Sequence, residues 1–188
     1  MEQLPSAIEQ LLLGIEESRL SSAIAGSLFI YPGILAAHGV GMALVVGLNI
    51  ALSLRVMGVA TALPLRGMTA FYPVMWLALM LNVMTGVSLA MSAATRVFVD
   101  PVFWAKMLFV GLATWNMWRL KRELLKEPLS SAPEVPEAAA ASTLSTPLRL
   151  RTVPSRRLRS IALASFLFWA MAITLGRFMA YTFFRFWQ

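Results

Sequence analysis

The sequence predicts an all-α integral membrane protein, a four-helix bundle preceded by a short amphipathic surface helix. Of its 188 residues, 59% are hydrophobic and only 13% are charged, whereas soluble domains carry about 25% charged residues. Four stretches have close to the roughly 20 apolar residues that a membrane-spanning helix needs. These stretches are rich in Ala, Leu and Met and lack strict alternation, which disfavours the strands of a membrane barrel.

Residues 1–22 are expected to form the amphipathic outer-surface helix and a connector. Leucines and isoleucines recur on one helical face, and Glu2, Glu9 and Glu16 fall elsewhere. Because the polar face is acidic, we do not expect it to serve attraction to anionic lipid. It either caps the bundle or docks a periplasmic partner. The segment has no basic n-region, so it is not expected to be a signal peptide.

Residues 23–120 are expected to hold the first three membrane-spanning helices. These run from about Gly33 to Leu54, between Arg66 and Arg96, and from Pro101 to Trp118. Pro32 suits the first turn of a helix and disrupts an interior. The first span is therefore expected either to start near Pro32 or to kink there.

Residues 121–160 read as a basic linker rich in Pro and Ala, and 161–188 as the fourth membrane-spanning helix with an aromatic C-terminal end. Most of the 16 Lys and Arg residues flank the spans on the side of this linker. The positive-inside rule then makes that side cytoplasmic and places both termini in the periplasm of a bacterial inner membrane. Aromatic residues are not interleaved with the basic ones, which argues against nucleic-acid binding. The aromatic end comprises Phe183, Phe184, Phe186 and Trp187.

Several kinds of chemistry are excluded by composition. The chain has no cysteine and one histidine, which rules out disulfides, thiolate metal sites and multi-histidine metal sites within one chain. Phosphate-binding, dinucleotide-binding and nucleophile-elbow motifs are lacking. We therefore expect a binding or redox subunit rather than an enzyme.

Three ionisable residues fall inside the predicted spans: His38, Lys106 and Arg177. Such residues are costly in hydrocarbon and are functional candidates. The helix rise places each about 8–9 Å from the outer face. Two cations beside one imidazole, with no acidic partner inside a span, favour a site for an anionic ligand.

Small residues recur every four positions on the first span. Close helix packing is the commoner reason for such a pattern, but small residues also leave room for a flat ligand beside His38. Gly39 and Gly41 belong to the two stripes and are candidate ligand-contacting residues. The stripes are Gly39, Ala43, Gly47, Ala51 and Gly33, Ala37, Gly41.

A b-type haem would fit this pattern, with His38 as an axial ligand and Lys106 and Arg177 on the propionates. Met84 is a weak candidate for the second axial position, as are Met80 and Met107; a second copy of His38 across a homodimer is another. A copper or small-anion site stays open. So does the interpretation without a ligand, in which both cations snorkel to the interface and His38 hydrogen-bonds a neighbour such as Asn82 or Thr85.

Several residues also carry a family resemblance. The pattern Tyr31-Pro32, His38-Gly39-x-Gly41, Leu54-Arg55-x-x-Gly58, Pro73, Trp76, Thr85-Gly86, Asp100-Pro101-x-Phe103-x-x-Lys106 and Asn116 resembles an uncharacterised bacterial family of small four-helix membrane proteins. More remotely, His38-Gly39, Lys106 and Asn116 are similar to the membrane domain of CopD-like copper-resistance proteins. That similarity implies a link with copper handling or with cytochrome-b-like haem binding. Cytochrome-b-type bundles use several histidines, and this chain has one.

Two functional hypotheses follow. In the first, the protein binds haem b or another anionic ligand in the outer leaflet and has an electron-transfer or copper-related role. In the second, it is a cofactor-free membrane anchor or accessory subunit of a larger complex. Its expected surroundings are the lipid bilayer, with a homodimer or larger membrane complex left open.

Overall fold

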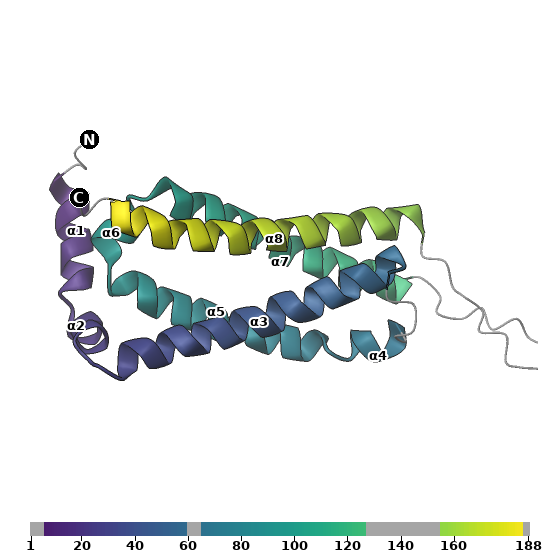
Figure 1. Ribbon diagram of the computed structural model, residues 1–188, viewed down its shortest axis with the longest axis horizontal. Helices are drawn as coiled ribbons and strands as arrows, with labels where there is room; N and C mark the ends of the chain where they lie inside the picture. The colour runs from purple at the N-terminus through teal and green to yellow at the C-terminus, as the bar shows by residue number, and fades with distance from the viewer. Residues whose placement is uncertain (1–5, 60–64, 127–154, 186–188) are drawn as a thin grey trace, which may run out of the picture.

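The computed structural model describes residues 6–59, 65–126 and 155–185, and within these ranges every regular element is a helix. The all-α prediction is thus confirmed for this part of the chain. Four long helices run along one axis: α3 (Ile30–Met57), α5 (Tyr72–Met91), α7 (Pro101–Lys126) and α8 (Arg156–Arg185) (Figure 1). The shorter helices are α1 (Ser6–Glu16), α2 (Arg19–Ala25), α4 (Leu65–Thr69) and α6 (Ala94–Val97).

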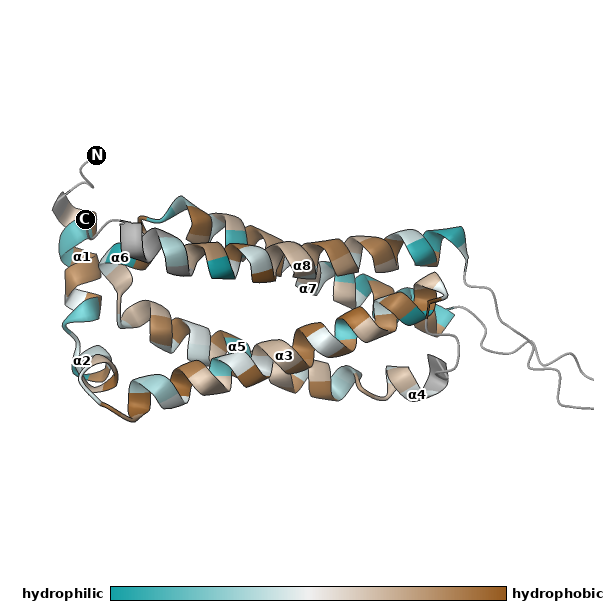
Figure 2. Cartoon of the chain, in the orientation of Figure 1, coloured by the Kyte–Doolittle hydropathy of each residue, from teal (hydrophilic) through white to brown (hydrophobic). Residues whose placement is uncertain are grey.

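In the described ranges, three helical segments are long and apolar enough to cross a membrane: Ile30–Met57, Gly67–Met91 and Arg156–Met179. Their apolar residues occupy the middle of the molecule in Figure 2. The helix of the third predicted span, α7, is 26 residues long but is not one of the three. Lys106, Asn116 and its basic last turns lower its hydropathy. Its passage through a membrane therefore stays a prediction.

The ends of α3 follow from local chemistry. The helix begins at Ile30, so Pro32 lies in its first turn, where the missing N–H costs nothing. It ends at Gly58, which has a φ of 94° and donates its N–H to the Arg55 carbonyl. Only glycine adopts that left-handed conformation without strain.

The helices α7 and α8 are both capped by side chains. The Asp100 carboxylate accepts the Val102 N–H at 2.8 Å, and Pro101 is the first residue of α7. The Ser155 hydroxyl oxygen accepts the Leu158 N–H at 3.2 Å at the start of α8. The two helices thus extend into both ends of the predicted linker 121–160. Its Pro- and Ala-rich middle lies outside the described residues, and so do the side chains of the aromatic C-terminal end.

The most extensive helix contacts join α7 to α8, α3 to α5 and α3 to α8. Because α8 touches both α7 and α3, it links the two antiparallel pairs. Val45, Leu52, Met75, Met117 and Trp169 are among the buried residues of the shared core. This packing fixes which faces of the long helices remain exposed.

The short helices α1, α2 and α6 cover one end of the molecule, called here the α1 end (Figure 1). The Glu16 carboxylate in α1 accepts both the N–H of Thr95, at 3.0 Å, and its hydroxyl, at 2.6 Å. From α2, the Ser21 hydroxyl donates to the Met91 carbonyl at 3.0 Å. The N-terminal segment is therefore tied to the end of the long helices, in keeping with a capping role.

Buried polar side chains lie inside the core. Ser165 on α8 donates to the Asn49 Oδ1 on α3 at 2.6 Å, and Asn116 Nδ2 on α7 donates to the Ile161 carbonyl at 2.7 Å. A further set of buried atoms has no hydrogen-bond partner among the described residues: Asn49 Nδ2, Ser53 Oγ, Tyr72 Oη and Trp169 Nε1. Each such group left unpaired costs about 1–3 kcal/mol.

Candidate functional site

His38 lies on α3 near the α1 end and packs against α5. A Cβ atom added to Gly86 would be 3.2 Å from the His38 Cε1, so the ring occupies the space that a side chain on Gly86 would need. The ring Nδ1 is 3.0 Å from the Thr85 hydroxyl, and Asn82 Nδ2 donates to the His38 carbonyl at 2.8 Å. Of the two neighbours that the ligand-free interpretation offered for the imidazole, Thr85 contacts the ring, whereas Asn82 bonds the His38 backbone carbonyl.

The hydrogen-bond geometry favours one tautomer of a neutral His38 ring. The Thr85 hydroxyl has one hydrogen, and its oxygen lies 2.7 Å from the Leu81 carbonyl one turn earlier. Both contacts are satisfied when that hydrogen goes to the carbonyl and Nδ1 carries the ring proton, which it then donates to the Thr85 oxygen. The lone pair of Nε2 then remains available for a metal ion or a hydrogen-bond donor. Metal-binding histidines are held by this same arrangement, in which the other ring nitrogen donates a hydrogen bond.

Lys106 reaches this site from α7. Its aliphatic stem passes over Gly176 of α8, where an added Cβ would be 3.7 Å from the Lys106 Cε. The same added Cβ would be 3.9 Å from the Lys106 Nζ. Lys106 is half-buried, and in the described part of the chain no carboxylate lies within 4.0 Å of it. The structure thus places a cation without a carboxylate partner beside Gly176 of α8.

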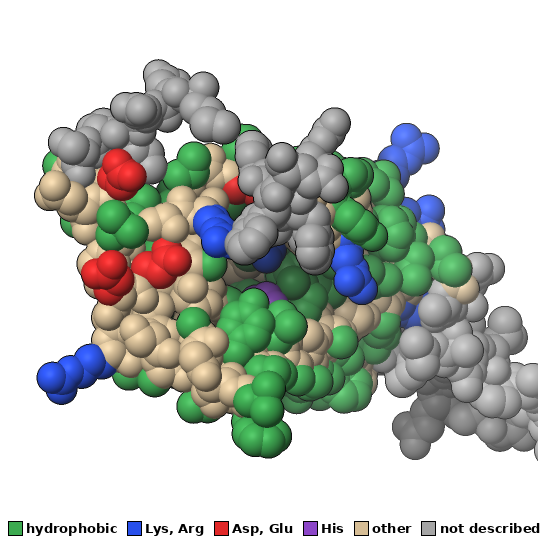
Figure 3. Space-filling view, turned by 60° about the vertical axis from the view of Figure 1, so that its left-hand side comes forward, with side chains coloured by type: hydrophobic (Ala, Val, Ile, Leu, Met, Phe, Trp, Pro, Cys, Tyr) green, Lys and Arg blue, Asp and Glu red, His purple; other side chains and the backbone are tan. Residues whose placement is uncertain are grey.

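Arg177 follows Gly176 directly and is exposed. The contact between Lys106 and Gly176 places Arg177 within the same turn of α8 as the Lys106 stem. Figure 3 shows the histidine side chain in a hollow at the α1 end, with basic side chains around it. The three ionisable side chains thus come from α3, α7 and α8 and lie at one level along the helices.

The two candidate glycines have different surroundings. Gly41 is buried, and an added Cβ would be 3.2 Å from both the Ala78 carbonyl oxygen and the Asn82 Nδ2. It therefore allows the backbones of α3 and α5 to approach each other. Gly39 is exposed, and an added Cβ would meet nothing within 4 Å. Of the two, Gly39 leaves open space and Gly41 serves packing.

The structure does not bring Met84 to His38. Met84 is 70% exposed, and it lies about 200° around α5 from Asn82, which faces α3. Met80 is also highly exposed, so neither methionine shares the space beside the imidazole. Met107, beside Lys106, is 38% exposed. The methionines of α5 thus offer no second axial ligand on the His38 side.

Two glycines, Gly86 and Gly176, belong to the site and were not singled out as site residues from the sequence. Each makes room for an ionisable side chain on a neighbouring helix: Gly86 for His38, Gly176 for Lys106. The sequence offered one signal for them: Gly86 follows Thr85 and Gly176 precedes Arg177, two residues already considered for the site. Which helix each glycine faces depends on packing that the sequence pattern does not contain.

Clusters of three or more metal-ligating His, Cys, Asp or Glu side chains do not occur among the described residues. The site is thus built around one imidazole and two cations rather than around a dedicated metal cage. Searches for relatives give no further guidance, since no family model, no curated protein and no solved structure matches the chain. The resemblance to an uncharacterised bacterial membrane family and to CopD-like domains stays a prediction.

Proposed function

We propose that the chain crosses a bacterial inner membrane as a four-helix bundle, with α7 as the fourth membrane-spanning helix. The exposed side of α7 supports this role. Trp104, Leu108, Leu112 and Trp115 are all exposed and recur at helical spacing. Together they form an apolar stripe of about 16 Å, which suits contact with lipid chains better than contact with water.

The site at the α1 end then lies in the outer leaflet, where we propose that it binds haem b. The observation that carries this proposal is the hydrogen bond between the His38 Nδ1 and the Thr85 hydroxyl, which leaves Nε2 available as a ligand. The donor set fits the group, since His38 would supply an imidazole nitrogen for the iron and Lys106 and Arg177 would supply cations for the propionates. Bound haem would supply one-electron transfer.

The test is the visible absorption spectrum of the full chain, purified in detergent after expression with ample haem. We expect a Soret band and sharp α and β bands on reduction with dithionite. His38→Ala should abolish these bands while the protein elutes as a folded species. Lys106→Gln should weaken haem retention about tenfold or more, because a charge-assisted bond contributes about 1.5–3 kcal/mol.

A matched control is Arg19→Gln, which removes an exposed cation at the same end of the molecule, on α2. This variant should retain haem as the unmodified protein does. An unchanged spectrum in His38→Ala would overturn the axial role of His38. A colourless wild-type protein under ample haem would overturn the haem proposal.

The orientation can be tested with single cysteines, since the chain has none of its own. Glu9→Cys on α1 should react with a membrane-impermeant maleimide in intact spheroplasts. Arg156→Cys at the start of α8 should react only after the membrane is broken. Both positions are exposed, so the opposite pattern would reverse the proposed topology.

A second candidate function, a cofactor-free accessory subunit, is favoured by the acidic surface of α1. Figure 3 shows acidic side chains gathered at the α1 end. Glu9 and Glu17 are exposed, while Glu16 is held by Thr95. The two exposed carboxylates suit a basic periplasmic partner. Co-purification of a stoichiometric partner that is lost in a Glu9→Gln, Glu17→Gln variant would support this function, and a partner-free homo-oligomer would contradict it.

A further inference from the structure

The core contains polar side chains that the proposed ligand site does not use. They come from three of the long helices: Asn49 and Ser53 on α3, Tyr72 on α5, and Ser165 and Trp169 on α8. All five are at most 1% exposed. We call them the interior polar cluster.

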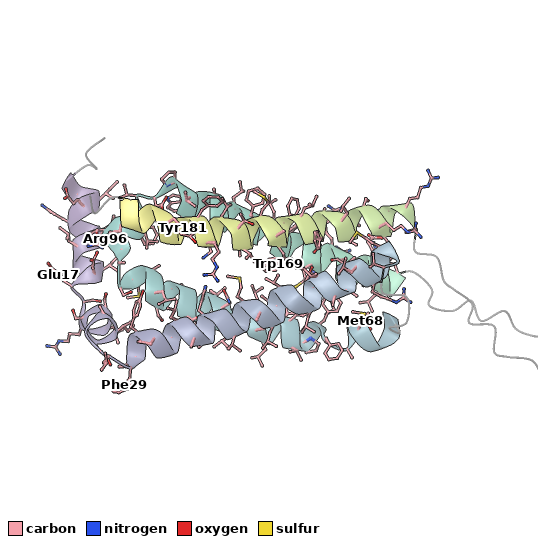
Figure 4. All side chains as sticks on the ribbon, in the orientation of Figure 1. Glu17, Phe29, Met68, Arg96, Trp169 and Tyr181 are labelled. Carbon is pink, nitrogen blue, oxygen red and sulfur yellow. The ribbon has the colours of Figure 1, made fainter. Side chains whose placement is uncertain are left out.

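One hydrogen bond sets the register of these residues along the helix axes. Ser165 donates to Asn49, which aligns the first third of α8 with the last third of α3. Ser53 lies one turn from Asn49 on α3, and Trp169 one turn from Ser165 on α8. Figure 4 labels Trp169 midway along the molecule.

Tyr72 is brought to the same level by the packing of α5 on α3. Gly41 lies against Ala78 and Asn82, and the two helices run antiparallel. Asn49 follows Gly41 by eight residues, and Tyr72 precedes the Ala78–Asn82 turn by six to ten. Both displacements are about 12 Å in the same direction, so the Tyr72 backbone lies level with that of Asn49. The Tyr72 ring lies 5.5 Å from the Lys121 Nζ of α7.

The hydrogen-bonding atoms of this cluster are mostly donors without acceptors. Asn49 Nδ2 and Trp169 Nε1 are donors only, and Ser53 Oγ and Tyr72 Oη can donate or accept. The Asn49 Oδ1 is already used by Ser165. Four such atoms left unpaired would together cost a large share of the stability of a domain. A small molecule that can both accept and donate hydrogen bonds can pair with the two N–H donors and with the two hydroxyl groups.

We propose that the interior polar cluster binds water molecules inside the hydrophobic core, between α3, α5 and α8. Water is the small molecule with both required functions, and buried waters typically make about three hydrogen bonds to otherwise unpaired polar groups. The unpaired atoms of Ser53 and Trp169 lie about one turn on either side of the Asn49–Ser165 bond, which suits a short file of waters. This proposal does not depend on haem binding at His38.

The test uses the full chain in detergent, labelled with ¹⁵N at the indole nitrogens of its six tryptophans. Trp169→Phe identifies the Trp169 N–H signal by its loss. We expect this signal to show cross-relaxation with water and to resist broadening by a water-soluble gadolinium chelate, because Trp169 is 1% exposed. Lack of contact with water would overturn the proposal. Contact with water together with broadening would also overturn it, since the core would then be open to bulk solvent.

A stability measurement provides a second test. If the Ser53 hydroxyl binds water, Ser53→Ala lowers the thermal unfolding midpoint by more than the matched variant Ser88→Ala, whose hydroxyl donates only within its own helix, to the Met84 carbonyl. If the hydroxyl is unpaired, its removal leaves the midpoint unchanged or raises it. The second result would contradict the proposal.

Discussion

Gly86 shows how one residue without a side chain determines the geometry of the candidate site. The His38 Cε1 would be only 3.2 Å from a Cβ at position 86, and the ring Nδ1 bonds the preceding residue, Thr85. The ring is thereby held by a contact on one side and a hydrogen bond on the other. The orientation of the Nε2 lone pair is thus set by α5, not by the helix that carries the histidine.

We therefore expect Gly86→Ala to press on the His38 ring and to gain less stability than Gly39→Ala, because the new Cβ would be 3.2 Å from the His38 Cε1. Gly39→Ala is the matched control, since it lies one residue from His38 and its Cβ meets open space. It should raise the free energy of unfolding by about 0.5–1 kcal/mol, because alanine is the better helix former. Thermal unfolding in detergent measures both, and equal effects of the two substitutions would contradict the packing of His38 against Gly86.

At the scale of elements, α1 is held at the end of the long helices by one carboxylate. Glu16 accepts two hydrogen bonds from Thr95 in α6, while its neighbour Glu17 is exposed (Figure 4). Leu12 is the buried leucine of α1, while Leu11 and Leu13 are exposed. The position of α1 therefore depends strongly on the Glu16–Thr95 contact.

We expect Glu16→Ala to release α1. Loss of a charged hydrogen-bond acceptor should speed amide hydrogen exchange in α1 about ten- to a hundredfold. Glu17→Ala removes an adjacent carboxylate and should leave that exchange unchanged. Mass-spectrometric hydrogen exchange compares the two variants, and similar exchange in both would show that Glu16 does not hold the helix.

The long helices were predictable from sequence because apolar runs near 20 residues in length carry a strong signal. The placement of Lys106 beside the turn of α8 that holds Arg177 was also predictable, because the helix rise converts residue number into distance along a helix. Rotation about each helix axis was not, and it is rotation that places Met84 on the far face of α5 from His38. The short helices α2, α4 and α6 were missed because four to seven residues give too few turns for a periodic pattern.

The bounds of α7 show a second limit of sequence reasoning. The predicted span stopped at Trp118, where apolar residues give way to basic ones, yet the helix continues to Lys126. Hydropathy reports where a span leaves the membrane, whereas the helix continues as long as its residues favour it and its packing on α8 persists. Leu120 and Leu124 of α7 are buried in the shared core. Their burial explains why the helix continues beyond Trp118.

At the scale of the whole molecule, an ion-pair cluster joins α7 to α8 at the end opposite the α1 end, where α4 lies (Figure 1). The Glu123 carboxylate on α7 lies 3.2 Å from Lys126 Nζ and 3.5 Å from a guanidinium nitrogen of Arg157 on α8. The hydrogen bond from Lys126, with the nearby charges of Arg157 and Arg122, holds the pKa of Glu123 below its usual range. A depressed pKa means that the ionised carboxylate stabilises the folded state.

This contribution is present above the pKa of glutamate in the unfolded chain, about 4.3, and is lost as the pH falls through the lower value of the folded state. We expect Glu123→Gln to lower the unfolding midpoint slightly at pH 7 and to match the unmodified protein near pH 3. Unfolding curves recorded from pH 3 to 7 measure the difference. A difference that stayed constant over this range would contradict the electrostatic tie.

The position of α8 between α7 and α3 also has a consequence for biosynthesis. The helix that joins the two pairs is the last of the long helices to leave the ribosome, after α3, α5 and α7. While residues 156–185 are still being synthesised, the α7 side chains that later pack on α8 lack that partner. The Lys106 side chain likewise lacks its contact with Gly176. Assembly of this protein is therefore completed only after translation of its C-terminal helix, and nascent chains halted before Arg156 should be recognised by membrane quality control as unassembled.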